Sequence, residues 1–363
     1  ARYPLTDWLS AMFRTGRDWY EHNRKRVRAK DGINFPDGGF SEEVIERSET
    51  NTHFLLTATR PLTSDLTVTA TAGAERRDQN YRLHGVNVAT LVVPNIYSLQ
   101  NAGSTPAVRD LVERKRVNSV LGTLNLNFRG YLNVDLTGRN DWSSTLPEEH
   151  NSFFYPSVSG AFVFTDAFGM QSSFLSSGKV RAGWTRVGND TDPYQLAATF
   201  QSTAAWDGLP RFTVPGALPN ADLKPEEKTA WEVGADLGFF NERLGLVVAD
   251  YDERARNQTQ GVHRPPPRGY TRQPVSDGEI RNWGYEMLLR AVPVRLDNGF
   301  TWETTVNFAL PKNEVVDLYG GEDGIDAYRL GGAYWSLEVQ ARRGRPYGVL
   351  WGNGFLRHEG KIV

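Results

Sequence analysis

Apolar and polar side chains alternate one by one along a stretch in the first half of the chain. Within YLNVDLTGR, residues 131–139, the side chains of Leu132, Val134 and Leu136 are apolar, and the side chains between them are polar. A period of two places successive side chains on opposite faces of an extended strand. The pattern therefore predicts a β-strand with one apolar face and one polar face.

The same alternation recurs along most of the chain after residue 51. Further strand candidates lie near 52–61, 65–75, 120–128, 153–164, 178–188, 229–240, 243–253, 280–291 and 300–310. Together they make about ten strands, and most reach the ~10 tilted residues that a strand needs to cross a bilayer. Residues 1–51 lack the pattern, so we expect an irregular, extracellular loop there, with a short helix near residues 8–13.

Short and long connections alternate between the predicted strands. The gaps near 62–64, 129–130, 241–242 and 295–298 are short, whereas those near 77–113, 189–226 and 259–278 are long. Outer-membrane barrels have short periplasmic turns and long extracellular loops. We therefore expect an all-β fold, an antiparallel up-and-down transmembrane β-barrel, with residues 52–363 forming a partial barrel domain.

In such a barrel the apolar face contacts lipid and the polar face borders the lumen, because a charge that faces hydrocarbon is costly. The charged residues expected to face the lumen are Asp135, Arg181, Glu232, Asp236, Glu286 and Arg290. Aromatic residues near the strand ends are expected to form a girdle at the membrane surface. They are Trp142, Trp231, Tyr131 and Tyr251.

Composition excludes several classes of protein. The formal net charge is −2, which gives no sign of a nucleic-acid partner. The chain has no cysteine, hence no disulfide framework and no thiolate metal site. No apolar run approaches the ~18 residues of a membrane helix. A soluble β-sheet with its polar face in water remains the alternative to the barrel.

Several segments, taken in order, resemble the SusC/RagA family of TonB-dependent outer-membrane transporters. The resemblance is strong over residues 113–357 and thinner over 50–112. It rests on YLNVDLTGRNDWSSTLP at 131–147, NSFFYPSVSGAFVFTD at 151–166, KVRAGWTRVGNDTDPYQL at 179–196, NADLKPEEKTAWEVGADLGFFNERLGLVVADYDERARNQ at 220–258, GEIRNWGYEMLLRAVPV at 278–294 and GRPYGVLWGNGFLR at 344–357.

The resemblance implies a fold and a function. Members have a barrel of about 22 strands with a plug inside. They import oligosaccharides or peptides across the outer membrane, with energy from the TonB complex and with a SusD-like surface lipoprotein as partner. About ten strands are half of such a barrel, and we find neither plug nor TonB box. We therefore expect an internal segment of a longer protein, because unpaired strand edges are untenable in lipid.

Two other functions stay open at this point. The first is a passive porin-like or adhesin barrel, which would lack a plug and a TonB box. The second is a soluble carbohydrate-active β enzyme, which would need no detergent and would cleave glycans. The cargo also stays open, because aromatic loop residues suit glycans whereas Arg and Asp suit peptides.

The sequence offers little sign of catalysis, so we expect no enzyme and no cofactor. The six histidines are scattered without the spacing of a zinc site. Glu148, Glu149 and His150 are interpreted as a solvated loop tip. The run 189–192, Asn-Asp-Thr-Asp, is expected to order its loop through side-chain-to-backbone bonds. Calcium binding by these oxygens is the lesser alternative.

The sharpest polar cluster is Arg139, Asn140, Asp141 and Trp142, at the end of the first strand described above. A Trp ring can stack on a sugar or peptide while Asn and Asp bond its hydroxyls or amides. These four residues are therefore the candidate substrate contacts. The competing interpretation, which we favour, is structural: Trp142 belongs to the aromatic girdle and the polar groups fasten the loop to the wall.

Overall fold

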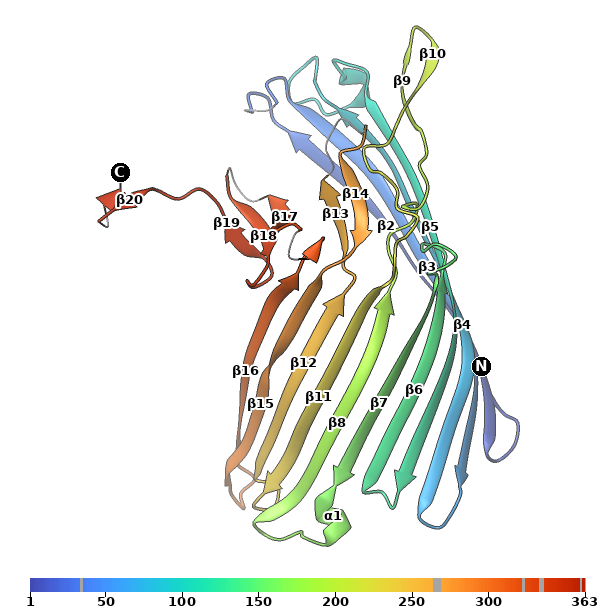
Figure 1. The fold of residues 1–363 in the computed structure, drawn as a ribbon, viewed down its shortest axis with the longest axis vertical. Helices are drawn as coiled ribbons and strands as arrows, with labels where there is room; N and C mark the ends of the chain where they lie inside the picture. Colours follow the sequence, from blue (N-terminus) through green and yellow to red (C-terminus); the bar gives the residue numbers. More distant parts are fainter. Residues whose placement is uncertain (33–34, 264–268, 322–323, 333–335, 360, 363) are drawn as a thin grey trace.

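The computed structural model describes residues 1–363 except 33–34, 264–268, 322–323, 333–335, 360 and 363. In this part of the chain, twelve strands form one sheet in which each strand pairs antiparallel with the next (Figure 1). They are β1 (Arg2–Pro4), β2 (Leu9–Arg28), β3 (Gly39–Pro61), β4 (Leu66–Val88), β5 (Ala107–Phe128), β6 (Leu132–Ser143), β7 (Ser152–Val163), β8 (Leu175–Asn189), β11 (Glu226–Phe239), β12 (Leu244–Arg256), β15 (Glu279–Arg295) and β16 (Thr301–Asp317).

Smaller elements lie between and after the wall strands. They are η1 (Leu99–Asn101), α1 (Phe164–Phe168), β9 (Gln201–Trp206), β10 (Leu209–Thr213), β13 (Thr259–His263), β14 (Arg272–Ser276), β17 (Ala327–Gly332), β18 (Glu338–Arg342), β19 (Val349–Trp351), β20 (Arg357–His358) and β21 (Lys361–Ile362). Of these, β9 pairs with β10 and β13 with β14, while β17, β18 and β19 form a three-stranded sheet. In the part of the chain that the structure describes, no helix is long and apolar enough to cross a membrane.

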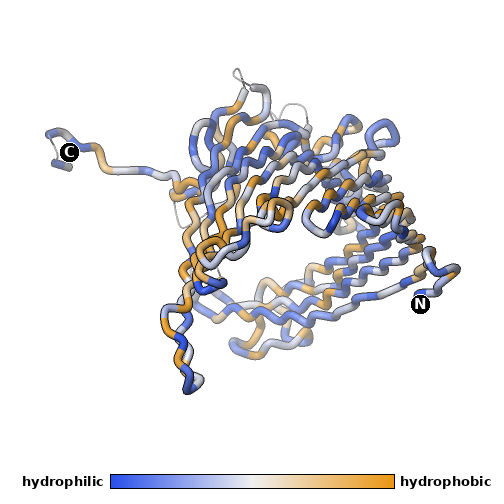
Figure 2. The backbone as a smooth tube through the Cα atoms, turned by 90° about the horizontal axis from the view of Figure 1, so that it is seen from below, coloured by the Kyte–Doolittle hydropathy of each residue, from blue (hydrophilic) through white to orange (hydrophobic). Residues whose placement is uncertain are grey.

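The twelve-stranded sheet curves into part of a barrel wall. Figure 2 shows it from below, bent around an open interior. Its end strands are β1 and β16, and they do not pair with each other in the described part of the chain. The expected all-β, up-and-down barrel architecture is therefore confirmed as a partial, open barrel.

The predicted alternation of short and long connections is also confirmed. One end of the wall carries the connections 5–8, 62–65, 129–131, 240–243 and 296–300, together with the link that contains α1 (Figure 1). The other end carries the longer loops 89–106, 190–225 and 257–278. At the short turn after β5, Arg129 and Gly130 both have positive φ, as a tight hairpin turn requires. By this asymmetry the end with short turns is periplasmic and the end with long loops is extracellular.

The expectation of an irregular segment over residues 1–51, with a short helix near 8–13, is wrong. Residues 9–28 form β2, and β3 begins at Gly39. The apolar outer face of β2 is short: Leu9 and Phe13 pair with Ala58 and Phe54. Beyond it both faces of β2 carry charged and polar side chains, so the alternation that marks the other strands is missing.

Strands β3, β4 and β5 are longer than the sequence pattern predicts. They run for 22 or 23 residues, about twice the ~10 that a bilayer requires. Their upper halves therefore stand above the membrane on the extracellular side.

The buried apolar residues do not form one central core. One small cluster joins Phe40 and Val88 to Leu91 in the loop after β4. Another joins Val315 and Leu318 to Ala341 on β18. Both lie where extracellular loops meet the wall. The wall itself is a single layer, held by ladder hydrogen bonds.

Candidate functional site

The strand register gives the wall two chemically different faces. Residues that pair directly lie on the same face of a sheet. One row across the wall joins Leu124, Leu136, Val158, Trp184 and Trp231. Leu136 and Val158 keep about two-fifths of their surface exposed, although they are apolar, at 39% and 41%. This face is the outside of the wall, where lipid takes the place of water.

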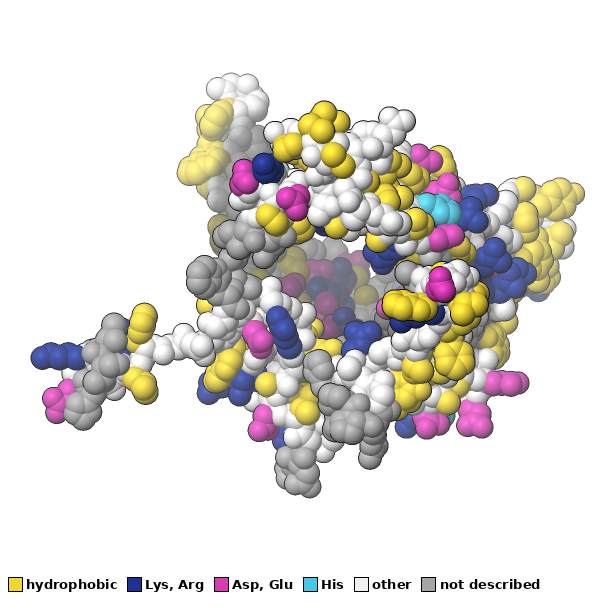
Figure 3. All heavy atoms as spheres, turned by 90° about the horizontal axis from the view of Figure 1, so that it is seen from above, with side chains coloured by type: hydrophobic (Ala, Val, Ile, Leu, Met, Phe, Trp, Pro, Cys, Tyr) yellow, Lys and Arg dark blue, Asp and Glu magenta, His cyan; other side chains and the backbone are white. Residues whose placement is uncertain are grey.

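The neighbouring row on the opposite face is polar. It joins Thr123, Thr137, Ser157 and Thr185. Seen from the extracellular end, the wall surrounds an open space in which charged side chains are visible (Figure 3). This face is the candidate functional site, because it is where a polar solute could pass.

Arg139 is the centre of a polar network on the inner face. Its Nη1 lies 2.6 Å from Oε2 of Glu75 on β4, and its Nη2 donates to Ser119 on β5 at 2.7 Å. Its Nε lies 2.8 Å from both Asp141 on β6 and the hydroxyl of Tyr155 on β7. The Tyr155 hydroxyl also donates to Asp141. One guanidinium therefore ties four adjacent strands together.

The structure divides the predicted cluster between the two sides of the wall. Arg139 and Asp141 lie on the inner face, where Asp141 is buried. Asn140 and Trp142 lie on the outer face. The Asn140 side chain donates to Ser152 at 3.0 Å, and Trp142 is exposed at the extracellular end of β6, where a girdle residue belongs. No single ligand can contact all four residues from one side of the wall.

Glu75, Ser119 and Tyr155 complete the network, and no sequence motif singles them out. Glu75 and Arg139 are 64 residues apart in the chain. The register of two consecutive strand pairings, β4 with β5 and β5 with β6, brings them close together. Alternation along each strand does place them on the inner face, and that is the one signal available without the structure.

A second charged group lines the inner face between β8 and β11. Arg181 binds Asp236 at 2.6 Å and Glu232 at 3.0 Å, and Lys179 binds Asp236 at 2.5 Å. On β15, Arg290 pairs with Glu303 at 2.6 Å. The register places all six charges that were expected to face the lumen on this side. They are Asp135, Arg181, Glu232, Asp236, Glu286 and Arg290.

The aromatic girdle is confirmed only in part. Trp231 pairs with Trp184 on the outer face, and Tyr131 packs edge-on against Phe128 and Phe162 at the periplasmic turns. Tyr251, in contrast, pairs with Glu232 and therefore faces inward, so its girdle assignment is wrong. At this part of β12 the acidic residues Asp250 and Asp252 occupy the outer face and Tyr251 the inner face, which is the opposite of the expected arrangement.

The loop after β8 folds inward over the extracellular end of the wall. Asp190 is buried, accepts a hydrogen bond from Ser143 at the end of β6, and forms an ion pair with Lys115 on β5. The hydroxyl of Tyr194 accepts a bond from the backbone N–H of Arg114 at 3.2 Å. The loop is thus ordered by bonds to distant strands, and not by the local turn bonds that the sequence suggested. Among the described residues, no three His, Asp or Glu side chains are grouped to hold a metal.

Hydrogen bonds connect this loop to other extracellular segments, and connect those segments to one another. Lys224 and Ser276 exchange bonds of 3.1 and 3.0 Å, which joins the loop before β11 to β14. Leu223, the residue before Lys224, is fully buried. The backbone N–H of Gly261 on β13 donates to the Tyr328 hydroxyl on β17 at 3.1 Å. The loops therefore form one connected layer at the extracellular mouth.

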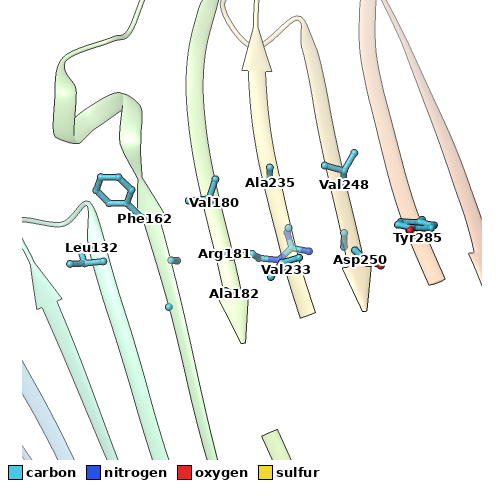
Figure 4. A pocket seen from close by; sticks show the side chains of 14 residues that line it. Leu132, Phe162, Val180, Arg181, Ala182, Val233, Ala235, Val248, Asp250 and Tyr285 are labelled. Carbon is cyan, nitrogen blue, oxygen red and sulfur yellow. The ribbon is translucent and has the colours of Figure 1, made fainter. Parts of the chain in front are cut away.

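A hollow of about 740 Å³ lies on the other side of the wall. Figure 4 shows Leu132, Phe162, Val180 and Val248 at its lining, across β6 to β12. These side chains belong to the outer face, so the hollow opens toward lipid. Most of its lining is apolar, although Arg181 and Asp250 also contribute to it. The inner face, which carries most of the charged side chains, is therefore the candidate path.

Comparison with known proteins supports this architecture. The family model described as TonB dependent receptor-like, beta-barrel, matches residues 4–358. TonB-dependent receptor P26 of Formosa agariphila is 27% identical over 215 residues, 58% of this chain and 22% of that protein. TonB-dependent receptor SusC of Bacteroides thetaiotaomicron is 26% identical over 229 residues, again 58% of this chain and 22% of that protein. The chain thus spans less than a quarter of these relatives' length.

Solved structures show the same fold. A structure of the RagAB peptide transporter matches with a TM-score of 0.78 at 19% identity, covering 95% of this chain and 38% of that one. The ferric-catecholate import receptor Fiu of E. coli K12 matches with a TM-score of 0.55 at 12% identity, covering 93% of this chain and 51% of that one. At these identities the likeness is one of fold.

Proposed function

Because the chain belongs to the TonB dependent receptor-like β-barrel family and lies in the bacterial outer membrane, we propose that it is part of an active importer. The cargo of the complete protein is an oligosaccharide or a peptide. This chain supplies about half of the wall, the polar lining of the lumen and the extracellular loops. No covalent chemistry is part of the proposal.

The observation that carries the proposal is the contrast between the two faces of one wall. The inner face presents ion pairs such as that of Arg181 with Asp236, at 2.6 Å, whereas the row one residue away on the outer face is apolar. A soluble sheet covered by a second layer would bury that apolar row. Here Leu136, Val158 and Trp184 stay open to the surroundings.

Two partners belong to the proposal. The TonB complex supplies the energy through a plug carried elsewhere in the complete protein, and a SusD-like lipoprotein covers the extracellular mouth. The connected loop layer around Leu223 and Tyr328 is the surface that such a lid would meet. One solved neighbour is the RagAB peptide transporter, and one curated relative is SusC. These matches support import without choosing the cargo.

The two faces can be tested with single cysteines, since the chain has none of its own. In the complete protein in cells, Thr123→Cys and Thr137→Cys are expected to react with a membrane-impermeant maleimide. Leu124→Cys and Leu136→Cys, one residue away, are expected to react only with a lipid-soluble reagent. Equal reaction of all four with the impermeant reagent would contradict a lipid-facing outer face.

Active import is tested separately by uptake. Cells that carry the complete protein are given labelled oligosaccharides and labelled peptides, with and without a functional TonB complex. Uptake of one cargo class that disappears without TonB supports the proposal. Uptake that persists without TonB identifies a passive porin-like barrel, and cleavage of a glycan by the purified protein identifies an enzyme.

A further inference from the structure

The outer face of β2 to β5 changes from apolar to basic at its extracellular end. The last fully apolar row across these strands joins Phe13, Phe54, Ala74 and Val120. Two outer-face positions higher, the row contains Arg17, Thr50, Asp78 and Arg116. The next rows add Trp19, Arg114 and Arg82.

Tryptophans mark the membrane surface along this part of the wall. Trp19 on β2 and Trp142 on β6 both face outward, and Trp19 has 61% of its surface exposed. Tryptophan is enriched at the level of lipid headgroups. Outer-face positions are about 7 Å apart along a strand. Arg114 lies in the same row as Trp19, Arg17 lies one outer-face position below that row, and Arg82 lies one position above it. An arginine side chain can extend toward the interface from either position.

Three of these arginines lack a counter-ion in the structure. Arg76 and Arg116 share Asp78, at 2.8 and 2.6 Å. Arg17, Arg82 and Arg114, in contrast, form no ion pair with any described residue, and all three are exposed. Exposed arginines beside a low-dielectric membrane attract anions more strongly than the same residues in open water.

The three arginines surround one hollow on the outside of the wall. It measures about 210 Å³, and its lining includes Arg17, Arg82, Arg114 and Trp19, with the small side chain of Ser48 between them. One carboxylate, Glu46, also lines it. A fourth arginine, Arg47, lines it from an inner-face position. The arginines outnumber the single carboxylate, which leaves the hollow positively charged.

We propose that this hollow binds the phosphate of a membrane lipid headgroup in the extracellular leaflet. The planar guanidinium donates paired hydrogen bonds that match phosphate oxygens. Trp19 packs against the adjoining part of the same lipid, as an interfacial aromatic does. The ligand comes from the membrane because the hollow lies just above the lipid-facing band and on the outside of the wall. The inference depends on the outer-membrane location and not on the cargo.

The test compares two triple variants of the complete protein in detergent. Arg17→Gln, Arg82→Gln and Arg114→Gln remove the proposed contacts. The control removes three charges elsewhere: Arg14→Gln and Arg26→Gln on the inner face, and Arg211→Gln on β10. Native mass spectrometry measures retention of added phosphatidylglycerol, of diacylglycerol, which lacks phosphate, and of inorganic phosphate. A triple Arg→Lys variant at the three contact positions keeps the charge and guards against loss of folding.

The proposal predicts that wild type and control bind phosphatidylglycerol alike, and that the Gln variant binds it at least tenfold more weakly. The Lys variant is expected to bind between the two, because lysine keeps the charge but not the paired geometry. Equal binding by the Gln variant would overturn the proposal. Retention of inorganic phosphate but not of lipid by the wild-type protein would also overturn it, as would retention of diacylglycerol equal to that of phosphatidylglycerol. A Gln variant that differs from wild type only in the association of two copies of the protein would overturn it too.

Discussion

Arg139 on β6 reaches across β5 to Glu75 on β4, with 2.6 Å between Nη1 and Oε2. Ladder hydrogen bonds join only neighbouring strands, so this contact adds a link of longer range within the wall. The same guanidinium donates to Asp141 and lies 2.8 Å from the Tyr155 hydroxyl. Because its side chain is only 26% exposed, little water competes for these bonds.

Replacing Arg139 is therefore expected to weaken the barrel wall. Arg139→Met leaves Glu75 and Asp141 without their cation, and we expect the free energy of unfolding to fall by about 2–4 kcal/mol. Urea unfolding of the complete protein in vesicles measures it. The control is Arg129→Met, which removes an exposed ion pair with Asp65 and is expected to change the stability far less, because solvent screens that pair. Equal effects of the two variants would show that the network adds no stability.

The alternation in the sequence was enough to locate ten of the wall strands, because one face of each contacts lipid and the other faces a polar interior. It failed where that contrast ends. The segment from Arg17 to Arg28 in β2 is mostly polar on both faces, as are the upper halves of β3 and β4. Beyond the hydrocarbon a strand needs no apolar face, so it has no reason to alternate.

The site was harder to anticipate than the fold. The sequence predicts Arg139, Asn140, Asp141 and Trp142 as one cluster because the four are adjacent in the chain. Adjacent residues of a strand point to opposite faces. Glu75 and Tyr155 reach Arg139 only because of the register of the pairings from β4 to β7. Short sequence motifs do not predict that register.

The two faces of β6 should tolerate charge differently. Leu136 lies on the outer face within the apolar band, and Thr137 follows it on the inner face. Leu136→Arg is expected to destabilise the folded barrel by about 2–4 kcal/mol, whereas Thr137→Arg should cost less than about 1 kcal/mol. The fraction that resists unfolding by detergent on an electrophoresis gel measures this. Similar losses for both variants would mean that the outer face does not contact hydrocarbon.

The inward fold of the loop after β8 should depend on Asp190. Lys115→Met would leave this buried carboxylate without its cation, and Asp190→Asn would remove the charge itself. Hydrogen exchange of residues 190–197 is expected to accelerate in either variant. In a double-mutant cycle the two changes should couple by about 1–3 kcal/mol. Lys224→Met, which replaces an exposed lysine in the same loop, is the control, and an equal acceleration there would contradict the assignment.

A periplasmic ion pair should make stability depend on pH in one direction only. Arg129, in the turn after β5, donates from Nη2 to Oδ2 of Asp65, in the turn after β3, at 2.8 Å. This hydrogen bond holds the pKa of Asp65 below its usual 3.8. Because the pKa is lowered on folding, the stabilisation is present above pH 3.8 and is lost as the pH falls through the lowered value.

Asp65→Asn is thus expected to be less stable than wild type at pH 7 and to match it at a pH below the lowered pKa. The difference should be small and should shrink in high salt, since both side chains are exposed. Thermal unfolding of the complete protein across this pH range measures it. Asp7→Asn, in the turn before β2, removes a carboxylate for which the described residues show no ion pair and should show no such dependence. A difference that grew toward low pH would reverse the sign and contradict the pairing.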